Sequence, residues 1–486
     1  MSLIEETTTA SLAPRKIADL PGPRGLPWLG NTLQMDRHRL HLQLEEWARR
    51  YGDAYTISIL PRRFLVLSNP EAVATVLRDR PDGFRRTVRL EQISAELGFL
   101  GLFSANGDTW RRQRPMVLAG LDPSHIKAFF PTLIQVTERF ANRWRKAARS
   151  GEAIDLQADL MRYTVDVTAA LAFGEDINTI EAGQDVLIQH HLNQVLPQLF
   201  KRVFSPFQSW KYFPSAADKA LPGHLEAIRK AVEGFMATTA RKLQEEPELR
   251  EHPANLIQAM MAARDREGSG ITDTDVSGNI LTMLLAGEDT TANTLAWLIW
   301  LLHRNPQALR QASDEARAVL AGGTCPRSVD EVARLDFIEA CAYEAMRLKP
   351  VAPLIVNQAL RDTVVGGIEV PAGSLVMCLM RPAAVDAGNF PEPMAFDPAR
   401  WIKGTGAAAH SLGSSKRVVM PFGAGPRICP GRYLALTEIK MVMAMLLANF
   451  EIADVATDDG GEPQERISLT MYPVGLEMRL KQAAAQ

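Results

Sequence analysis

The chain has 486 residues, of which 46% are hydrophobic and 23% are charged, and its formal net charge is -2. This composition predicts a globular protein with a large core, and the near-neutral charge provides no basic surface of the kind that binds nucleic acid. The four cysteines, Cys325, Cys341, Cys378 and Cys429, contain no CxxC pair, which argues against a disulfide framework and against a zinc site.

Residues 1–19 are polar and contain no apolar stretch long enough for a signal peptide or a membrane anchor. We therefore expect a flexible N-terminus on a soluble, cytoplasmic protein. The segments 54–59 and 63–68 predict the two strands of a β-hairpin. Helical spacing of apolar residues predicts helices over 40–52, 69–79, 107–120, 124–149, 155–173 and 218–245.

The longest predicted helix spans 272–305, with Thr272 or Asp273 as its N-cap. Glu288 and Asp289 interrupt its apolar run, which favours a buried helix over a membrane-spanning one.

The last third of the chain adds the β part of the fold. The pattern predicts short strands over 363–380, a strong helix over 431–450 and a hairpin over 467–480 with Pro473 at or near its bend. We find no linker, repeat or charge block in the sequence. We therefore expect a mostly α fold with a minor β part, in a single domain over 20–486.

The segment 421–432, with the sequence PFGAGPRICPGR, places Cys429 at the start of the predicted 431–450 helix. The free N–H groups and the dipole of a helix N-terminus favour a thiolate there, and glycines let the backbone turn tightly. A glycine-rich turn with an incidental cysteine is the plain alternative. The segment lacks GxGxxG and GxxxxGK(S/T), which argues against a phosphate-binding loop, and no resolving cysteine lies nearby for a redox thiol.

The pattern F-x-x-G-x-R-x-C-x-G, formed by Phe422, Gly425, Arg427, Cys429 and Gly431, resembles the haem-binding loop of the cytochrome P-450 family, the haem-thiolate monooxygenases. The resemblance implies that Cys429 is the axial ligand of the iron of haem b. It further implies that Phe422 packs beside the thiolate, that Arg427 pairs with a haem propionate and that Gly431 lies against the macrocycle. A thiolate ligand donates electron density that favours O–O cleavage.

The segment AGEDTT, Ala286 to Thr291, lies in the middle of the longest predicted helix and matches the family pattern (A/G)-G-x-(D/E)-T-T. Taken alone, it would be a polar break in an amphipathic helix. Gly287 weakens a helix and threonine hydroxyls bond to carbonyls one turn back, so we expect a distortion that makes room for O2 and water beside Ala286. The resemblance implies that Asp289 and Thr290 relay protons during O2 reduction.

Glu344 and Arg347 are three residues apart on one helix face, which in isolation indicates a surface ion pair of little worth. The family uses E-x-x-R at this place, together with a downstream arginine, as a structural brace beneath the haem. The candidate is Arg400 in FDPARW. The family more often has a glutamate where this chain has Ala399, which removes one carboxylate from the expected brace.

Trp110 and Arg114 in WRRQR match the family pattern W-x-x-x-R, whose side chains bond to haem propionates. A basic helix face with a buried tryptophan is the alternative for this segment alone. Where the family often places another propionate-binding arginine or histidine, this chain has Asn357, so that contact is weakened or supplied from elsewhere.

The resemblance covers residues 20 to the end and implies a triangular, mostly helical fold with haem between the 272–305 and 431–450 helices. It implies a monooxygenase that inserts one oxygen atom of O2 into a lipophilic small molecule by hydroxylation or epoxidation. Electrons would come from a separate ferredoxin or flavodoxin and its NAD(P)H-dependent reductase, and we expect no fused reductase, no membrane anchor and a monomer.

The expected substrate pocket is largely apolar, so a lipophilic ligand held mainly by burial is predicted. Fatty acid, terpenoid, steroid and polyketide all remain open as its class. A haem-thiolate peroxygenase or isomerase that needs no reductase is the first alternative function, and a non-catalytic helical binding protein is the second. The pocket positions implied by the resemblance are Leu285, Ala286, Val351, Leu354, Ile355 and Met471.

Overall fold

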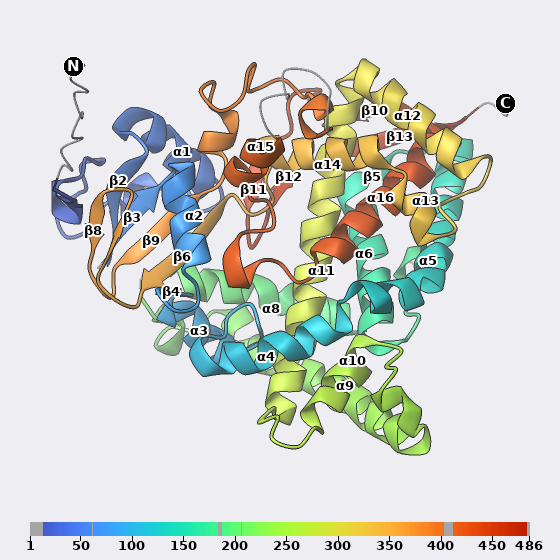
Figure 1. Cartoon of the computed structure of the whole chain (residues 1–486), viewed down its shortest axis with the longest axis horizontal. Coiled ribbons are helices and arrows are strands. Elements are labelled where there is room, and N and C mark those ends of the chain that lie inside the picture. The colour runs from blue at the N-terminus through green and yellow to red at the C-terminus, as the bar shows by residue number, and fades with distance from the viewer. Residues whose placement is uncertain (1–12, 61, 183–186, 206, 403–411, 484–486) are drawn as a thin grey trace, which may run out of the picture.

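The computed structural model describes residues 13–60, 62–182, 187–205, 207–402 and 412–483. Helices form most of it, and a smaller β-rich part lies to one side, where N-terminal strands neighbour strands from the last third of the chain (Figure 1). The prediction of a mostly α fold with a minor β part is confirmed. Among the described helices, we find none that combines the length and the apolar surface needed to cross a lipid bilayer.

The predicted helices are confirmed with their ends shifted by a few residues at most. The α-helices are α1 (Leu40–Tyr51), α2 (Pro70–Arg78), α3 (Val88–Glu96), α4 (Gly107–Gly120), α5 (Pro123–Ser150), α6 (Leu156–Phe173), α7 (Thr179–Ala182), α8 (Leu187–Phe204), α9 (Ala216–Glu245), α10 (Leu256–Arg264), α11 (Asp273–His303), α12 (Pro306–Leu320), α13 (Val329–Ala333), α14 (Asp336–Leu348), α15 (Leu412–Val418) and α16 (Arg432–Asn449).

The strands form four small sheets. In the largest, the order is β2-β3-β9-β6-β4, with β3 parallel to β9 and the other neighbours antiparallel. The others are β1-β8-β7, β10-β13-β5 and β11-β12. The bounds are β1 (Arg15–Lys16), β2 (Ala54–Ile59), β3 (Arg62–Leu67), β4 (Phe84–Arg85), β5 (Ile154–Asp155), β6 (Leu354–Ala359), β7 (Thr363–Val365), β8 (Ile368–Val370), β9 (Leu375–Leu379), β10 (Phe450–Ala456), β11 (Glu465–Ile467), β12 (Met471–Pro473) and β13 (Glu477–Gln482).

One expectation about the β part needs correction, and another stays a prediction. Residues 1–12 of the segment expected to be flexible lie outside the described residues, and within the rest Arg15 and Lys16 pair with β8. The expected 467–480 hairpin is wrong in register: β11 pairs with β12, so the bend lies at 468–470, whereas β13 pairs with β10 and β5. Gly475, with φ 69, turns the chain between β12 and β13, so the two strands enter different sheets.

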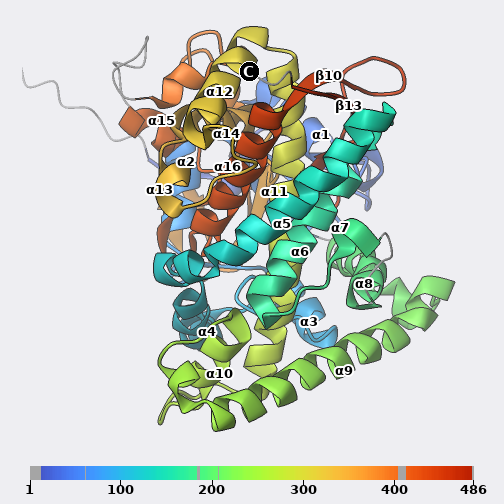
Figure 2. The same cartoon turned by 90° about the vertical axis from the view of Figure 1, so that its right-hand side faces the viewer.

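The central helix α11 runs through the middle of the helical part, beside α6, α14 and α16 (Figures 1 and 2). Thr272 is its N-cap, and the side chain of Asp275 completes a capping box, as the sequence suggested for this start. A Cβ atom at Gly287 would lie 2.6 Å from the hydroxyl oxygen of Thr168. Gly287 therefore serves the close approach of α6, and α11 continues through it as one helix rather than breaking.

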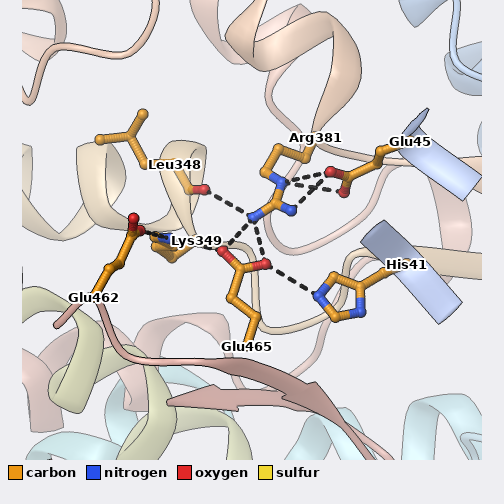
Figure 3. A network of polar contacts seen from close by, with 7 residues as sticks. All are labelled: His41, Glu45, Leu348, Lys349, Arg381, Glu462 and Glu465. Atoms are coloured by element: carbon orange, nitrogen blue, oxygen red, sulfur yellow. Dashed lines mark hydrogen bonds and ion pairs between the residues drawn. The ribbon is translucent and has the colours of Figure 1, made fainter. Parts of the chain in front are cut away.

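A buried polar network ties the two ends of the chain together (Figure 3). The Arg381 guanidinium, after β9, bonds to the carboxylates of Glu45 on α1 and Glu465 on β11, at 2.7 and 2.8 Å. His41 and Lys349 also contact Glu465, at 3.1 and 2.7 Å. Burial opposes ionisation of Glu465, but these hydrogen bonds and positive charges hold the pKa of its carboxyl well below the usual range.

Candidate functional site

The loop 421–431 leads into α16 and packs on the C-terminal end of α2. Gly423 and Gly425 have φ 76 and 71, in the left-handed region that favours glycine. A Cβ atom at Gly425 would lie 2.6 Å from the Cα of Arg78, so no larger residue fits there without movement. The Cys429 N–H donates to the carbonyl of Phe422 at 2.9 Å, which closes the loop around the cysteine. The loop is therefore held by glycine conformation and by the end of α2.

The thiol of Cys429 differs from the other three. Cys325, Cys341 and Cys378 are buried, whereas Cys429 has accessible surface. Burial by the surrounding protein raises the pKa of the Cys429 thiol, and the Gly431 N–H, which donates to the sulfur, and the charge of Arg114 oppose that rise. Gly431 is also the N-cap of α16, without a side-chain cap of its own. The sulfur thus lies deep in the protein, at a helix N-terminus, and can still be reached.

Arginines from three segments converge on this loop. The Arg427 guanidinium lies over the ring of Trp110, 5.0 Å from its centroid, so the W-x-x-x-R helix α4 meets the cysteine loop as expected. Arg114 donates to the carbonyl of Ile428 at 2.8 Å. Arg80, which follows α2, donates to the carbonyl of Ala424 at 3.3 Å.

Among the described residues, no carboxylate lies within ion-pair distance of this arginine cluster, and Glu91 acts on Arg427 only from farther away. We define the cluster as Arg80, Arg86, Arg114 and Arg427. Burial lowers the pKa of Arg427 to about 9 and that of Arg80 to about 10, and neighbouring cluster arginines lower the pKa of Arg427 further. Burial, then Arg80 and Arg427, hold the pKa of Arg86 well below its usual range. The Nε atoms of Arg86 and Arg427 are buried without a hydrogen-bond partner.

An anion with two carboxylates fits this cluster. Among the described residues, no cluster arginine forms an ion pair with a carboxylate, although each guanidinium can bind one in a bidentate manner. The two propionates of the haem expected from the resemblance carry the charge and the acceptor atoms that the cluster lacks. The residues present therefore fit this cofactor.

Sequence analysis did not identify Arg80, whose charge acts close to Asn357. The side-chain amide nitrogen of Asn357 lies 4.0 Å from the sulfur of Cys378, and its side-chain oxygen Oδ1 is buried without a partner. Arg80 acts on the same thiol, whose pKa burial raises to about 12 and the Arg80 charge lowers. Arg80 thus brings a positive charge to the place where the family often has an arginine or histidine and this chain has Asn357. In the sequence, the only indication of this role is that Arg80 belongs to the basic run RDRPDGFRR, 78–86.

Two other arginines near the cluster have partners within the protein. Arg85 forms an ion pair with Glu91, and Arg89 donates to the carbonyl of Arg202 at 2.9 Å.

Ala286, Asp289 and Thr290 lie in the middle of α11, which packs against α16. Ala286 is exposed although Leu285 beside it is buried, so open space adjoins this point of the helix. The hydroxyl of Thr290 donates to the carbonyl of Ala286 at 2.8 Å, as predicted for a threonine one turn on. Burial raises the pKa of the Asp289 carboxyl to about 6. An acid that titrates near neutrality therefore neighbours a hydroxyl and an open helix face.

The predicted substrate positions divide into two groups. Val351, Leu354 and Ile355 are partly exposed and remain available to a ligand. Met471 is fully buried in β12, where its N–H donates to the carbonyl of Val351 at 2.8 Å, and its place in the pocket stays a prediction.

Two exposed apolar side chains lie near α11. Leu469, 37% exposed, lies in the bend 468–470, and Thr470 beside it accepts a hydrogen bond from Asn293 of α11 at 3.1 Å. Phe103, 44% exposed, follows Leu102, whose N–H donates to Asn279 of α11 at 2.8 Å. Phe103 ends the 85–103 loop, which the family resemblance implies as part of the pocket, whereas Leu469 could not be placed on α11 from local sequence spacing.

The expected brace forms around Glu344. Its carboxylate accepts from Arg347 at 2.7 and 2.8 Å and from the Trp401 indole at 2.8 Å, and Arg400 lies 3.4 Å away. Glu344 and Arg347 are wholly buried. Asp397 lies 3.7 Å from Arg400, so a carboxylate two residues earlier supplies the charge that Ala399 lacks. Glu344 and Arg347 therefore form a buried ion pair and not a surface ion pair.

The comparisons with known proteins agree with this geometry. A family model described as Cytochrome P450 matches residues 20–479. Cyclooctatin synthase from Streptomyces melanosporofaciens is 28% identical over 93% of this chain and 94% of that protein. Carotene epsilon-monooxygenase, chloroplastic, from Arabidopsis thaliana is 25% identical over 89% of this chain and 79% of that protein. The heme domain of cytochrome P450DA has a TM-score of 0.80 at 23% identity, over 96% of this chain and 98% of that one, which shows a shared fold.

Glu344→Gln is expected to destabilise the protein by about 3–5 kcal/mol, because it leaves the buried Arg347 guanidinium without its anion. Denaturant unfolding of the purified protein measures this. The matched control is Glu226→Gln, which removes an exposed partner of Arg229 and should cost no more than about 1 kcal/mol. Equal losses in the two variants would contradict a buried brace.

Proposed function

The chain belongs to the cytochrome P450 family, and on that premise we propose that it oxidises a lipophilic small molecule with electrons from separate redox proteins. It is a cytochrome P450 monooxygenase, with haem b as cofactor and O2 as co-substrate. The proposal concerns what the family alone does not specify: the residues that carry the reaction, the substrate class and the electron donor. The observation that carries the residue assignment is the arginine cluster around an accessible cysteine.

Cys429 is proposed as the axial ligand. Of the chain's four cysteines, all of which the structure describes, it alone has accessible surface. The Gly431 N–H and the N-terminus of α16 favour its thiolate, and Phe422 closes the loop by a backbone bond. When bound, thiolate-ligated haem supplies the O2 activation that transfers one oxygen atom to a substrate.

The arginine cluster and Trp110 are proposed to hold the propionates. Arg114 and Arg427 are the two members that the sequence motifs assign, and Arg86 and Arg80 add two charges that need an anion. Propionates beside these groups would remove the repulsion that lowers the pKa values of Arg86 and Arg427. Binding of the cofactor and relief of this repulsion are then the same event.

Asp289 and Thr290 are proposed to deliver protons during O2 reduction. A carboxyl with a pKa of about 6 both binds and releases protons near neutral pH, which suits a general acid. The Thr290 hydroxyl donates its hydrogen to the carbonyl of Ala286, so its oxygen lone pairs can accept a hydrogen bond from another donor. The open helix face at Ala286 gives the space in which water and O2 would meet this pair.

The substrate is proposed to be a lipophilic compound such as a terpenoid, fatty acid, steroid or polyketide. Five apolar side chains with exposed surface support this class: Phe103 and Leu469, which lie close to α11, and the predicted pocket residues Val351, Leu354 and Ile355. Such surfaces bind mainly by burial of apolar area. The relatives named above include a carotene monooxygenase, which supports a hydrocarbon-like substrate.

The electron donor is proposed to be a ferredoxin or flavodoxin with an NAD(P)H-dependent reductase, acting on a cytoplasmic monomer. Lys416 and Arg417 lie on α15, a helix that contacts α2, against which the cysteine loop packs. Lys416 is exposed, and a cationic surface suits an acidic redox protein.

A reduced CO-difference spectrum tests the assignment of the ligand. We expect the red-shifted Soret band of thiolate ligation in the purified protein and its loss in Cys429→His, while Cys325→Ala keeps it. A band that survives in Cys429→His would contradict the assignment.

Product formation with NAD(P)H and redox proteins, compared with product formation with peroxide alone, distinguishes a monooxygenase from a peroxygenase.

Arg86→Gln is expected to accelerate loss of haem by roughly 10–100 fold, because a charged hydrogen bond is worth about 1.5–3 kcal/mol. Transfer of haem to apomyoglobin measures the rate. The control is Arg112→Gln, which removes a nearby arginine that pairs with Asp275 rather than joining the cluster. An Arg86→Gln rate equal to the control's would argue against propionate binding.

Thr290→Ala is expected to uncouple O2 consumption from product, because the hydroxyl that passes protons is gone. The ratio of product to O2 consumed measures coupling. Thr294→Ala is the matched control, since its hydroxyl makes the same bond one turn on, to the carbonyl of Thr290, from a buried position. If both variants stay coupled, Thr290 does not relay protons.

A further inference from the structure

Three histidines meet where α8 packs against α9, two helices that Figure 2 shows beside each other. His190 and His191 lie in α8 and His224 lies in α9. One ring nitrogen of each lies within 4.8 Å of those of the other two. The chain has 9 histidines, so a third of them gather in this one place.

The three face one another and not carboxylates. His41, His125 and His303 each lie within ion-pair distance of an Asp or Glu. Among the described ion pairs, none involves a histidine of the α8–α9 group. Its closest contact is instead between the Nδ1 atoms of His191 and His224, at 2.8 Å. One of these atoms must donate a proton to a lone pair of the other, so at least one of the two rings is neutral.

The contact between the ring nitrogens of His191 and His224 places a neutral imidazole in this group. A neutral imidazole is the form that binds a metal ion, whereas an imidazolium does not. The ring pairs also stay close, with centroids 5.1 Å apart for His191 and His224 and 6.1 Å apart for His190 and His224.

We propose that His190, His191 and His224 bind a divalent transition-metal ion, with Zn²⁺ as the reference case, and that the ion fastens α8 to α9. Three imidazole nitrogens suit Zn²⁺, Ni²⁺ and Cu²⁺ and do not suit Mg²⁺ or Ca²⁺, which prefer oxygen ligands. This site is independent of haem and of the proposed reaction.

The required adjustment is small. Zn–N bonds of about 2.0–2.1 Å in tetrahedral geometry place ligand nitrogens roughly 3.4 Å apart. The His191 and His224 nitrogens would separate by a fraction of an ångström, and His190 would rotate inward. His190 is exposed, so its ring can move, and solvent reaches the fourth position of the ion. The ion would thereby close the α8–α9 hairpin across its connecting segment.

Equilibrium dialysis against Zn²⁺ tests the proposal on the haem-saturated full chain with no affinity tag. We expect one saturable Zn²⁺ per chain, with binding that weakens as the pH falls and the rings are protonated. His191→Ala and His224→Ala should each reduce the affinity by roughly tenfold or more. His252→Ala, which removes an exposed histidine elsewhere, is the control and should bind as the parent does.

Thermal unfolding gives a second readout. Zn²⁺ should raise the unfolding temperature of the parent and of His252→Ala, but not of the conservative variant His191→Gln/His224→Gln, whose fold is checked by its haem spectrum. Absence of saturable binding in the parent would overturn the proposal. Undiminished binding in the double variant would overturn it as well, because the ion would then lie elsewhere.

Discussion

Burying several positive charges together without anions is the constraint around which this molecule is arranged. Arg80, Arg86, Arg114 and Arg427 come from the end of α2, the segment before α3, helix α4 and the cysteine loop, and burial lowers the pKa of each. An anion that joins such a cluster offsets the repulsion. If the haem propionates supply it, as proposed, the cofactor completes this part of the core and links the segments that carry the arginines.

The other buried arginines show how the chain treats a charge that serves structure alone. Arg347 has Glu344, and Arg381 has both Glu45 and Glu465. Each of these is matched by carboxylates supplied by the protein. The bonds of Arg381 tie segments far apart in the sequence, whereas Glu344 and Arg347 lie on one helix. Buried arginines that pair with a carboxylate of the protein thus differ from the arginine cluster, whose members have no such partner among the described residues. This difference indicates a ligand site without the use of any sequence motif.

Features set by local spacing could be predicted from the sequence. The helices, the Thr272 cap and the Glu344–Arg347 pair follow from short-range patterns, whereas the approach of Trp110 to Arg427 was implied only by the family resemblance. What could not be predicted depends on contacts between distant segments. From the sequence, Gly287 indicates a weak point of a helix, whereas the structure shows that it allows the close approach of α6. The sequence of β13 likewise suggests one strand of a hairpin, whereas β13 pairs with β10. The places of Arg80 and Leu469 also depend on contacts between distant segments and could not be predicted for that reason.

The Arg381 network bears on how the protein is made. Its bond to Glu45 joins residues 336 apart in sequence, and the bond from Arg114 to the Cys429 loop spans 314. A ribosome releases α1 and α4 long before their partners exist, so the nascent N-terminal third must wait with apolar surface exposed. Such long-range closure slows folding and invites chaperone binding. The arginine cluster is consequently complete only after the Cys429 loop, 314 residues beyond Arg114, has been synthesised.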